Sequence, residues 1–252
     1  MKRLAVFASG RGSNFQAILG HVRMGILQNV EVRLLVTNIL DAPGATLARE
    51  KSIAVAFIEG VYGRKFASKQ DREEARNEFD KKALAVLGQE RIDLVALAGF
   101  MQVLGPTLVE AYRFHIMNIH PAKDFARFGG SGMFGDRVHA AVIQAREKES
   151  GCTIHYVDNS IDRGPTILQA TVPVKRGDTP ESLGHRILIH EHRTYSKAIQ
   201  LHVDERIQVK DGKAVIDWGG NWEDQWNRRQ EAFIRYQTEQ ARNTEQLLQP
   251  ST

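Results

Sequence analysis

Residues 4–19 read LAVFASGRGSNFQAIL, and this stretch decides how the fold begins. Residues 4–8 are a short apolar run, as expected for a buried strand. A turn with two glycines occupies residues 9–14, and residues 15–19 start a helical pattern. A strand that passes through a tight turn into a helix is the first part of a βαβ unit. The stretch therefore predicts an α/β fold whose first loop lies at the carboxyl end of a parallel strand.

The same alternation continues along the chain. We expect strands at 31–37, 53–58, 94–98 and about 113–119, and helices at 45–51, 73–87 and 137–148. A strand pair follows at 152–157 and 167–173, and Thr179 and Pro180 are typical of an N-cap and a first helical position. The uniformly apolar run 94–98 indicates a strand covered on both faces. The predicted fold class is α/β: a Rossmann-like, mostly parallel sheet with helices on both faces, plus a short C-terminal extension.

The composition changes near residue 204, so we predict one domain over 1–203 and an extension over 204–252. Within the extension, residues 207–209 and 214–216 flank Asp211-Gly212, which predicts a β-hairpin with a tight turn. Residues 221–249 are rich in Gln, Arg, Glu and Asn and predict a polar surface helix. Its few large apolar side chains are expected to dock on the domain or on a partner: Trp222, Trp226, Phe233 and Ile234.

The composition also narrows the function. The 252 residues are 42% hydrophobic and 25% charged, and the formal net charge is only +4 with basic and acidic residues interleaved. This balance fits a small anionic substrate better than a nucleic acid. Cys152 is the single cysteine, which excludes an internal disulfide and argues against a cysteine-based zinc site. The first predicted strand starts too early for a signal peptide, and no apolar run could span a membrane. We expect a cytoplasmic protein without nucleic-acid, membrane or metal partners, and the sequence is compatible with a homodimer.

The glycine loop favours phosphate over a dinucleotide. The third glycine of the dinucleotide fingerprint would fall at position 15, which is Phe15, and the second strand ends in Thr37-Asn38 without the acidic residue that holds a ribose. The backbone N–H groups at the start of the helix and the Ser13 hydroxyl suit a phosphate group. A tight strand-to-helix turn without a ligand accounts for these residues equally well.

Asn118 and His120 are candidates for catalysis because alternate residues of a strand face the same way. Their amide and imidazole groups can therefore converge on one small group. Asp162 lies in a polar loop at 158–165, and a carboxylate brought against His120 would stabilise the imidazolium and raise its pKa. A buried structural histidine and a plain acidic turn are the alternatives that these residues leave open.

Taken together, five segments in chain order resemble the folate-dependent formyltransferase family, in particular its members that act on glycinamide ribonucleotide. The segments are SGRGSNFQAI at 9–18, LAGFM at 97–101, NIHP at 118–121, DRGPTILQ at 162–169 and PVKRGD at 173–178. The resemblance covers about residues 2–203. It implies transfer of a formyl group from 10-formyltetrahydrofolate, the co-substrate, to the amine of glycinamide ribonucleotide in de novo purine biosynthesis, with no metal.

The resemblance also implies roles for individual residues. The catalytic group is Asn118, His120 and Asp162, with His120 held cationic by Asp162 and donating with Asn118 to the developing oxyanion. The substrate-binding residues are Gly12, Ser13 and Asn14 for the phosphate and Glu191 for the ribonucleotide. The folate-binding residues are Arg76, Met101, Gln102, Val103, Leu104, Asp158, Asn159, Ser160 and Ile161.

One segment departs from the family pattern. After His120-Pro121 the family has Ser-Leu-Leu-Pro, an aromatic residue and glycine, whereas this chain has AKDFARFGG at 122–130. The stretch from Asn118 to Asp162 is also longer than in typical members. Because this loop borders both ligand sites, two alternatives stay open. The chain could formylate another amine, such as a nucleotide-linked amino sugar, or be a non-catalytic folate- or nucleotide-binding relative.

Overall fold

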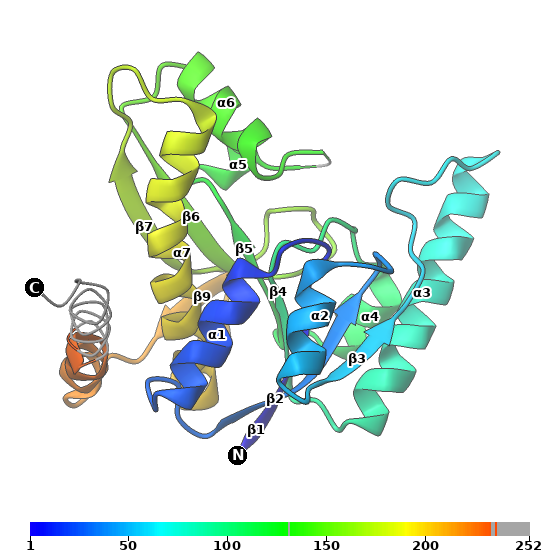
Figure 1. Ribbon diagram of the computed structural model, residues 1–252, viewed down its shortest axis with the longest axis horizontal. Helices are drawn as coiled ribbons and strands as arrows, with labels where there is room; N and C mark the ends of the chain where they lie inside the picture. Colours follow the sequence, from blue (N-terminus) through cyan, green and yellow to red (C-terminus); the bar gives the residue numbers. More distant parts are fainter. Residues whose placement is uncertain (131, 233–234, 236–252) are drawn as a thin grey trace, which may run out of the picture.

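The computed structural model describes residues 1–130, 132–232 and 235. Its centre is a seven-stranded sheet with the order β3-β2-β1-β4-β5-β6-β7 (Figure 1). The strands from β3 to β5 run parallel, and β6 and β7 are each antiparallel to the preceding strand. This arrangement confirms the predicted mostly parallel α/β sheet. The strands are β1 (Lys2–Phe7), β2 (Val30–Thr37), β3 (Ala54–Phe57), β4 (Leu94–Leu97), β5 (Ile116–His120), β6 (Glu149–Tyr156) and β7 (Thr166–Pro173).

Helices cover both faces of the sheet because the inner strands are apolar on both sides. On β1, Leu4 and Val6 pack into the core under α1 and α7, whereas Ala5 and Phe7 pack into the core under α3 and α4. All four side chains are buried. The helices on the first face are α1 (Ser13–Arg23), α2 (Pro43–Glu50), α6 (Asp136–Gln144) and α7 (Pro180–Val203). Those on the second are α3 (Lys69–Gln89) and α4 (Pro106–Ala111), and α5 (Phe125–Phe128) is a single turn beside the sheet.

Two helix predictions need correction. Helix α3 begins at Lys69 rather than at residue 73, because Ser68 and Asp71 form a capping box in which each side chain accepts the other residue's backbone N–H. The helix expected at 137–148 ends at Gln144, and residues 149–151 already pair with β7. The short helices α4 and α5 were not predicted. Thr179 and Pro180 start α7 as expected.

The C-terminal hairpin has the predicted turn. Strands β8 (Ile207–Lys210) and β9 (Lys213–Ile216) are antiparallel, and Asp211 and Gly212 between them have φ values of 49° and 71°. Two central residues with positive φ are what a type I′ turn requires, and the twist of that turn matches the twist of the two strands. The division of the chain at residue 203/204 itself stays a prediction.

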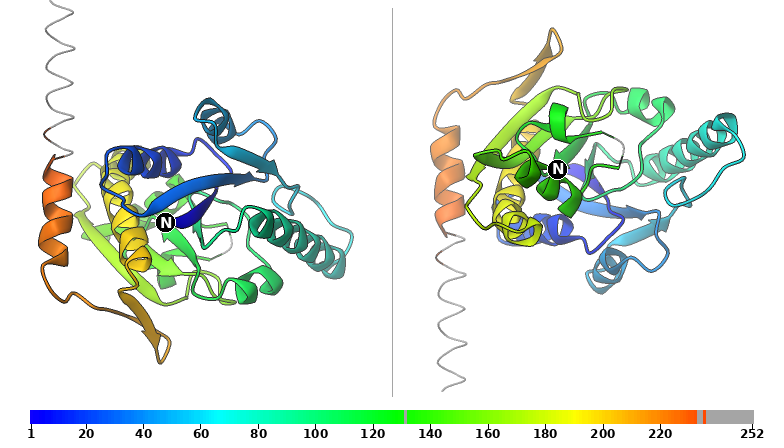
Figure 2. Two further views of the ribbon diagram at one scale, coloured as in Figure 1. Left: turned by 90° about the horizontal axis from the view of Figure 1, so that it is seen from below. Right: turned by 90° about the horizontal axis from the view of Figure 1, so that it is seen from above.

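Residues 222–232 are helical and lie alongside the domain (Figure 2). The rings of Trp222 and Trp226 are stacked with centroids 5.9 Å apart, and both side chains are buried against Ile26 and Leu201. The predicted docking of these two tryptophans on the domain is therefore confirmed. The other two apolar residues of that prediction, Phe233 and Ile234, lie outside the described residues.

A row of polar pairs joins α1 and its following turn to α7, which lie side by side in Figure 1. Two of the positions on the α1 side lie on the helix and make buried pairs, and the third, Gln28, lies in the turn after it and bonds through its backbone N–H. Each pair is satisfied only when the two helices are in one axial register. The pairs are Asn14 with Glu191 at 2.8 Å, His21 with Ser196 at 2.6 Å and Gln28 with Gln200 at 2.7 Å.

Candidate active site

The candidate site lies where the strand order changes direction. From β1 the chain moves outward to β2 and β3, then returns to β4 on the other side of β1. In open α/β sheets, ligands bind beyond the carboxyl ends of the strands at such a switch point. The buried Ser9 holds three of these ends together, because its Oγ donates to Asn38 Oδ1 at 2.6 Å and accepts from Met101 N at 2.9 Å.

The structure brings Asn118, His120 and Asp162 together. Asn118 and His120 project from the same side of β5, and Asp162 reaches them from the loop between β6 and β7. The Asn118 Nδ2 atom lies 3.4 Å from Asp162 Oδ1, and His120 Nδ1 lies 3.8 Å from Asp162 Oδ2. The Asp162 carboxylate also accepts the Gly130 N–H at 2.8 Å. One carboxylate thus faces the amide and the imidazole at once.

The surroundings of His120 act on its pKa in opposite directions. Its Nε2 lies 2.9 Å from the Phe128 carbonyl oxygen, so Nε2 carries a hydrogen and donates it, and Nδ1 faces Asp162. Burial lowers the pKa of His120, and this effect is larger than the opposing effects of Asp162 and the Phe128 carbonyl. Burial therefore opposes the cationic state that the resemblance implies for His120, whereas the charge of Asp162 favours it, and the cationic role stays a prediction.

His155 is a fourth polar residue of this group, and the sequence analysis missed it. It lies on β6 directly opposite Asn118 in the antiparallel register. Its Nε2 is 3.1 Å from Asn118 Nδ2 and 3.8 Å from Asp162 Oδ1, and its Nδ1 is 2.9 Å from the Tyr156 carbonyl oxygen. The sequence showed a histidine inside a predicted strand, but its contact with Asn118 follows only from the pairing of β5 and β6.

The glycine loop after β1 is shaped for an anion. Gly12 is the N-cap of α1 and has a left-handed φ of 75°, and a Cβ there would lie 3.2 Å from the Gly44 Cα. A side chain at position 12 would therefore be strained both by the backbone conformation and by the close approach. Ser13 is the first residue of α1, and the N–H groups of a first helical turn favour a bound phosphate.

Glu191 of α7 lies beside this loop. Its Oε2 accepts a hydrogen bond from Asn14 Nδ2 at 2.8 Å, and both side chains are buried. Burial raises the pKa of Glu191, and the hydrogen bond from Asn14 lowers it by a smaller amount. The structure therefore brings together the predicted phosphate loop and the predicted ribonucleotide carboxylate, which are far apart in the sequence.

The predicted folate residues gather on the other side of the switch point. Residues 101–104 follow β4, and the buried Gln102 accepts the Val61 N–H at 2.8 Å, which fixes the segment against residues 60–61. Arg76 of α3 reaches the same segment, because a Cβ built on Gly105 would lie 3.2 Å from Arg76 Cγ. Met101, Val103 and Leu104 lie in this stretch, and Leu104 packs into the core under α3.

The 158–162 loop borders the same region. Its Asp158 accepts the Ser160 N–H at 2.8 Å, and Asn159 donates to Glu110 of α4 at 2.6 Å, so the loop is attached to α4. Ile161 is 44% exposed, an apolar side chain open to solvent next to Asp162. The predicted folate residues thus lie in two segments, residues 101–104 after β4 and residues 158–161 after β6, with Arg76 of α3 near the first.

Helix α5 belongs to the segment that departs from the family pattern, and it packs directly on the site. Phe128 contributes the carbonyl that binds His120, and the Phe125 ring lies 5.0 Å from the His155 ring, centroid to centroid. A Cβ on Gly129 would overlap the Phe125 carbonyl oxygen and lie 2.9 Å from the Asp162 Cβ. Only glycine therefore lets this segment approach Asp162 so closely.

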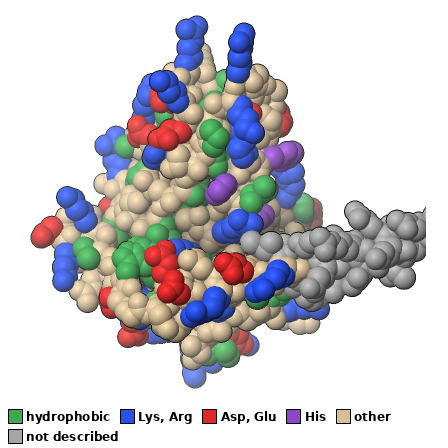
Figure 3. Space-filling model, turned by 90° about the vertical axis from the view of Figure 1, so that its left-hand side faces the viewer, with side chains coloured by type: hydrophobic (Ala, Val, Ile, Leu, Met, Phe, Trp, Pro, Cys, Tyr) green, Lys and Arg blue, Asp and Glu red, His purple; other side chains and the backbone are tan. Residues whose placement is uncertain are grey.

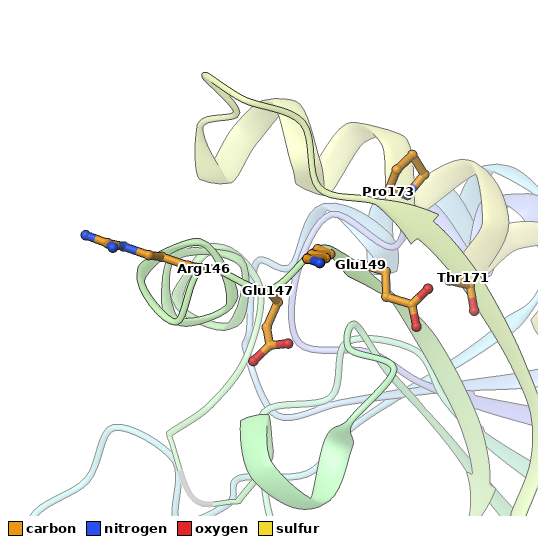
Figure 4. Close-up of a pocket in the computed structure, with 6 residues that line it drawn as sticks. Arg146, Glu147, Glu149, Thr171 and Pro173 are labelled. Atoms are coloured by element: carbon orange, nitrogen blue, oxygen red, sulfur yellow. The ribbon is translucent and has the colours of Figure 1, made fainter.

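Two depressions of about 680 and 430 Å³ lie near the start of β6, and Asn118, His120 and Asp162 line neither of them. Figure 4 shows the larger one, where Glu149 and Thr171 lie on β6 and β7 while Arg146 points away from the strands. The smaller one lies behind α5 and is lined by Phe125 and other residues. The larger depression lies at the α6–β6 connection, the smaller one lies between α5 and the start of β6, and both are separate from the candidate catalytic residues.

The remaining features concern metal ions, membranes, surface charge and the single cysteine. Within the described residues, no group of three His, Cys, Asp or Glu side chains is placed to hold a metal ion, and no helix is long and apolar enough to cross a membrane. Basic and acidic side chains are interspersed over the face shown in Figure 3. Cys152 is buried in the core, as expected, and burial raises the pKa of its thiol to about 12.

The sequence profile of the formyl transferase family matches residues 2–199. A chloroplastic phosphoribosylglycinamide formyltransferase of Arabidopsis thaliana is 38% identical over 216 residues, which is 85% of this chain and 70% of that protein. The phosphoribosylglycinamide formyltransferase of Escherichia coli is 31% identical over 85% of this chain and 93% of its own length. The crystal structure of glycinamide ribonucleotide transformylase 1 from Symbiobacterium toebii superposes with a TM-score of 0.74 at 34% identity, covering 86% of this chain and 94% of that one.

Proposed function

The chain belongs to the formyl transferase family, and from this we propose that it transfers a formyl group from 10-formyltetrahydrofolate to the amine of glycinamide ribonucleotide in purine biosynthesis. The observation that carries the proposal is the contact of Asn118, His120 and Asp162 at the switch point of the sheet. The family profile matches residues 2–199, a range that contains all of the candidate site residues, and relatives with this named activity match 85% of the chain.

The geometry suits acyl transfer to an amine. Attack of the neutral amine on the formyl carbon forms a C–N bond and gives an alkoxide oxygen and an ammonium nitrogen. Asn118 supplies an amide N–H that stabilises the oxygen. The ammonium proton must reach the folate nitrogen, which leaves with the electrons of the broken C–N bond.

His120 is the group best placed to handle this proton. Its Nε2–H is bound to the Phe128 carbonyl, so only Nδ1 is free to accept a proton. Once protonated, Nδ1–H lies beside Asp162, whose negative charge stabilises the imidazolium, and it adds a second donor to the oxyanion site. A neutral resting imidazole thus serves as the base first and as the acid and oxyanion donor afterwards.

The two substrates then occupy opposite sides of this group. The phosphate of the ribonucleotide binds the N-terminus of α1 at Gly12, Ser13 and Asn14, and Glu191 contacts the same ribonucleotide. The reduced folate lies between residues 101–105 and residues 158–161, with Arg76 at the edge. In this proposal both partners are small molecules, no metal takes part, and the protein works in the cytoplasm.

A two-substrate assay tests the function. Purified protein is mixed with 10-formyltetrahydrofolate and glycinamide ribonucleotide, and the released tetrahydrofolate is followed by absorbance. We expect turnover that saturates in both substrates. Turnover with a nucleotide-linked amino sugar but not with glycinamide ribonucleotide would replace the proposed acceptor. Tight folate binding without turnover of either amine would identify a non-catalytic relative.

A further inference from the structure

The surroundings of His155 define which of its nitrogens carries the proton. The Nδ1 atom lies 2.9 Å from the Tyr156 carbonyl oxygen, which can only accept, so Nδ1 carries a hydrogen. The Nε2 atom faces the amide nitrogen of Asn118 at 3.1 Å, and an amide nitrogen can only donate, so Nε2 is unprotonated. Both contacts are satisfied by a single species, the neutral Nδ1–H tautomer.

The opposite orientation of the Asn118 amide is disfavoured. It would place the amide oxygen against the Asp162 carboxylate and would require a second proton on His155. Burial lowers the pKa of His155, although Asp162, Asp158 and the Tyr156 carbonyl act in the opposite direction and His120 adds to the lowering. A buried imidazolium at this position is therefore costly. The contacts fix the amide with its nitrogen toward His155 and Asp162.

The two N–H groups of Asn118 then have different tasks. One is bound to His155 Nε2 at an ordinary hydrogen-bond distance. The other points toward Asp162 Oδ1 at 3.4 Å, which is longer than a normal hydrogen bond. That second N–H is available for an incoming carbonyl oxygen, whereas the first one prevents the amide from rotating.

We propose that His155 is a positioning residue that holds the Asn118 amide with one N–H donor turned toward the reacting formyl oxygen. The inference rests on the proposed function and deepens it. The Phe125 ring, which lies against the His155 ring with a tilt of 33°, holds the imidazole in this orientation. The α5 segment therefore contributes to the oxyanion site through His155 as well as through His120.

Paired variants test the role. His155→Leu removes the acceptor and keeps a similar volume, whereas His155→Gln keeps an oxygen that can accept from Asn118. Removal of a positioned hydrogen-bond donor reduces kcat by about 100- to 1000-fold. In His155→Leu the Asn118 donor is still present but no longer held in place, so we expect a smaller reduction of about 10- to 100-fold. We expect this loss in His155→Leu, with KM for both substrates within about twofold, and rescue to within a few-fold of wild type in His155→Gln.

His202 provides a matched control because it is a largely buried histidine bonded to the neighbouring Tyr156 hydroxyl at 2.8 Å, outside the site. His202→Leu should lower stability and leave kcat unchanged. Wild-type kcat in His155→Leu, or the same loss in both leucine variants, would overturn the proposal.

A spectroscopic measurement separates this inference from the function itself. In ¹⁵N-resolved imidazole spectra of the wild-type protein at pH 7, we expect His155 to show a protonated Nδ1 and an unprotonated Nε2. A protonated Nε2 overturns the positioning role whether or not the protein turns over glycinamide ribonucleotide. The expected tautomer in a protein that does not formylate this amine would support the amide orientation and contradict only the proposed acceptor. If His155→Leu does not fold, the wild-type imidazole spectrum and the kcat of His155→Gln test the positioning role.

Discussion

Replacement of Asp162 by asparagine removes one negative charge and keeps the shape of the side chain. The Asp162 carboxylate lies 3.8 Å from His120 Nδ1, and its side chain is only 15% exposed. Asparagine has the same shape, and it tolerates the left-handed backbone that Asp162 adopts at a φ of 50°. Its amide oxygen can still accept the Gly130 N–H, whereas its amide nitrogen takes the place of the oxygen that faces Asn118 Nδ2. The variant therefore removes the negative charge beside His120 together with the weak acceptor for Asn118.

The magnitude follows from the distance. Two unit charges about 4 Å apart interact by about 4 kcal/mol at an effective dielectric constant of 20. This is the stabilisation that a protonated His120 loses when the carboxylate is replaced. Because 1.4 kcal/mol corresponds to a factor of ten, the largest expected loss is about 1000-fold in kcat. Residual water and the remaining amide dipole reduce it, so we expect a decrease of about 100- to 1000-fold.

Steady-state rates with both substrates measure the effect, with folate binding followed separately by fluorescence. Folate affinity should change by less than about threefold. Asp124→Asn is the matched control, because Asp124 caps the neighbouring α5 by accepting the Arg127 N–H and asparagine caps a helix equally well. It should retain wild-type kcat. A decrease of less than tenfold in Asp162→Asn would refute the argument that this carboxylate stabilises a charged His120.

Three further predictions address binding and stability. Glu191→Gln should raise KM for glycinamide ribonucleotide by about 10- to 100-fold, because a hydrogen bond to a charged group contributes about 1.5–3 kcal/mol. KM for folate, measured from the same initial rates, should stay constant. Equal changes in both KM values would contradict this prediction. Trp226→Ala should lower the free energy of unfolding in urea by about 3–5 kcal/mol without changing kcat, since the Trp226 side chain is buried. A decrease of less than about 1 kcal/mol would contradict the docking of the extension on the domain. Burial and the neighbouring His192 and Arg193 lower the pKa of His21 to about 4. Between pH 6.5 and pH 4 the unfolded chain therefore binds a proton at His21 that the folded chain does not bind. The free energy of unfolding should fall as the pH drops through this range. Urea unfolding at pH 7.5 and 5.0 should show a smaller difference in His21→Gln than in wild type, and an unchanged difference would exclude His21 as a cause.

Local patterns in the sequence predicted much of the fold. Strand periodicity placed Asn118 and His120 on one side of β5, and the Asp211-Gly212 pair predicted a turn with two positive φ values. The start of α3 was wrong although its signal was present, because Ser68 and Asp71 have the spacing of a capping box. These features depend on neighbours within a few residues, which is why single-sequence reasoning reaches them.

Long-range features of the site were beyond that reasoning. The contact between His155 and Asn118 depends on the antiparallel register of β5 and β6, which no local pattern defines. The contact between Asn14 and Glu191 joins residues 177 positions apart, and only the family resemblance connected them. The pKa of His120 depends on how deeply the imidazole is buried, which the sequence does not define, and burial lowers this pKa more than the Asp162 charge raises it.

The row of polar pairs between α1 and α7 also has a consequence for synthesis of the chain. Asn14 leaves the ribosome long before Glu191, and at about 5–20 residues per second the interval is roughly 10 to 35 seconds. Until α7 emerges, the phosphate loop lacks its acidic partner, and the face of β6 that bears Cys152 and Ile154 lacks its cover. The substrate site can therefore be completed only when α7 docks, and the face of β6 is uncovered only while the residues between β6 and the end of α7 are made.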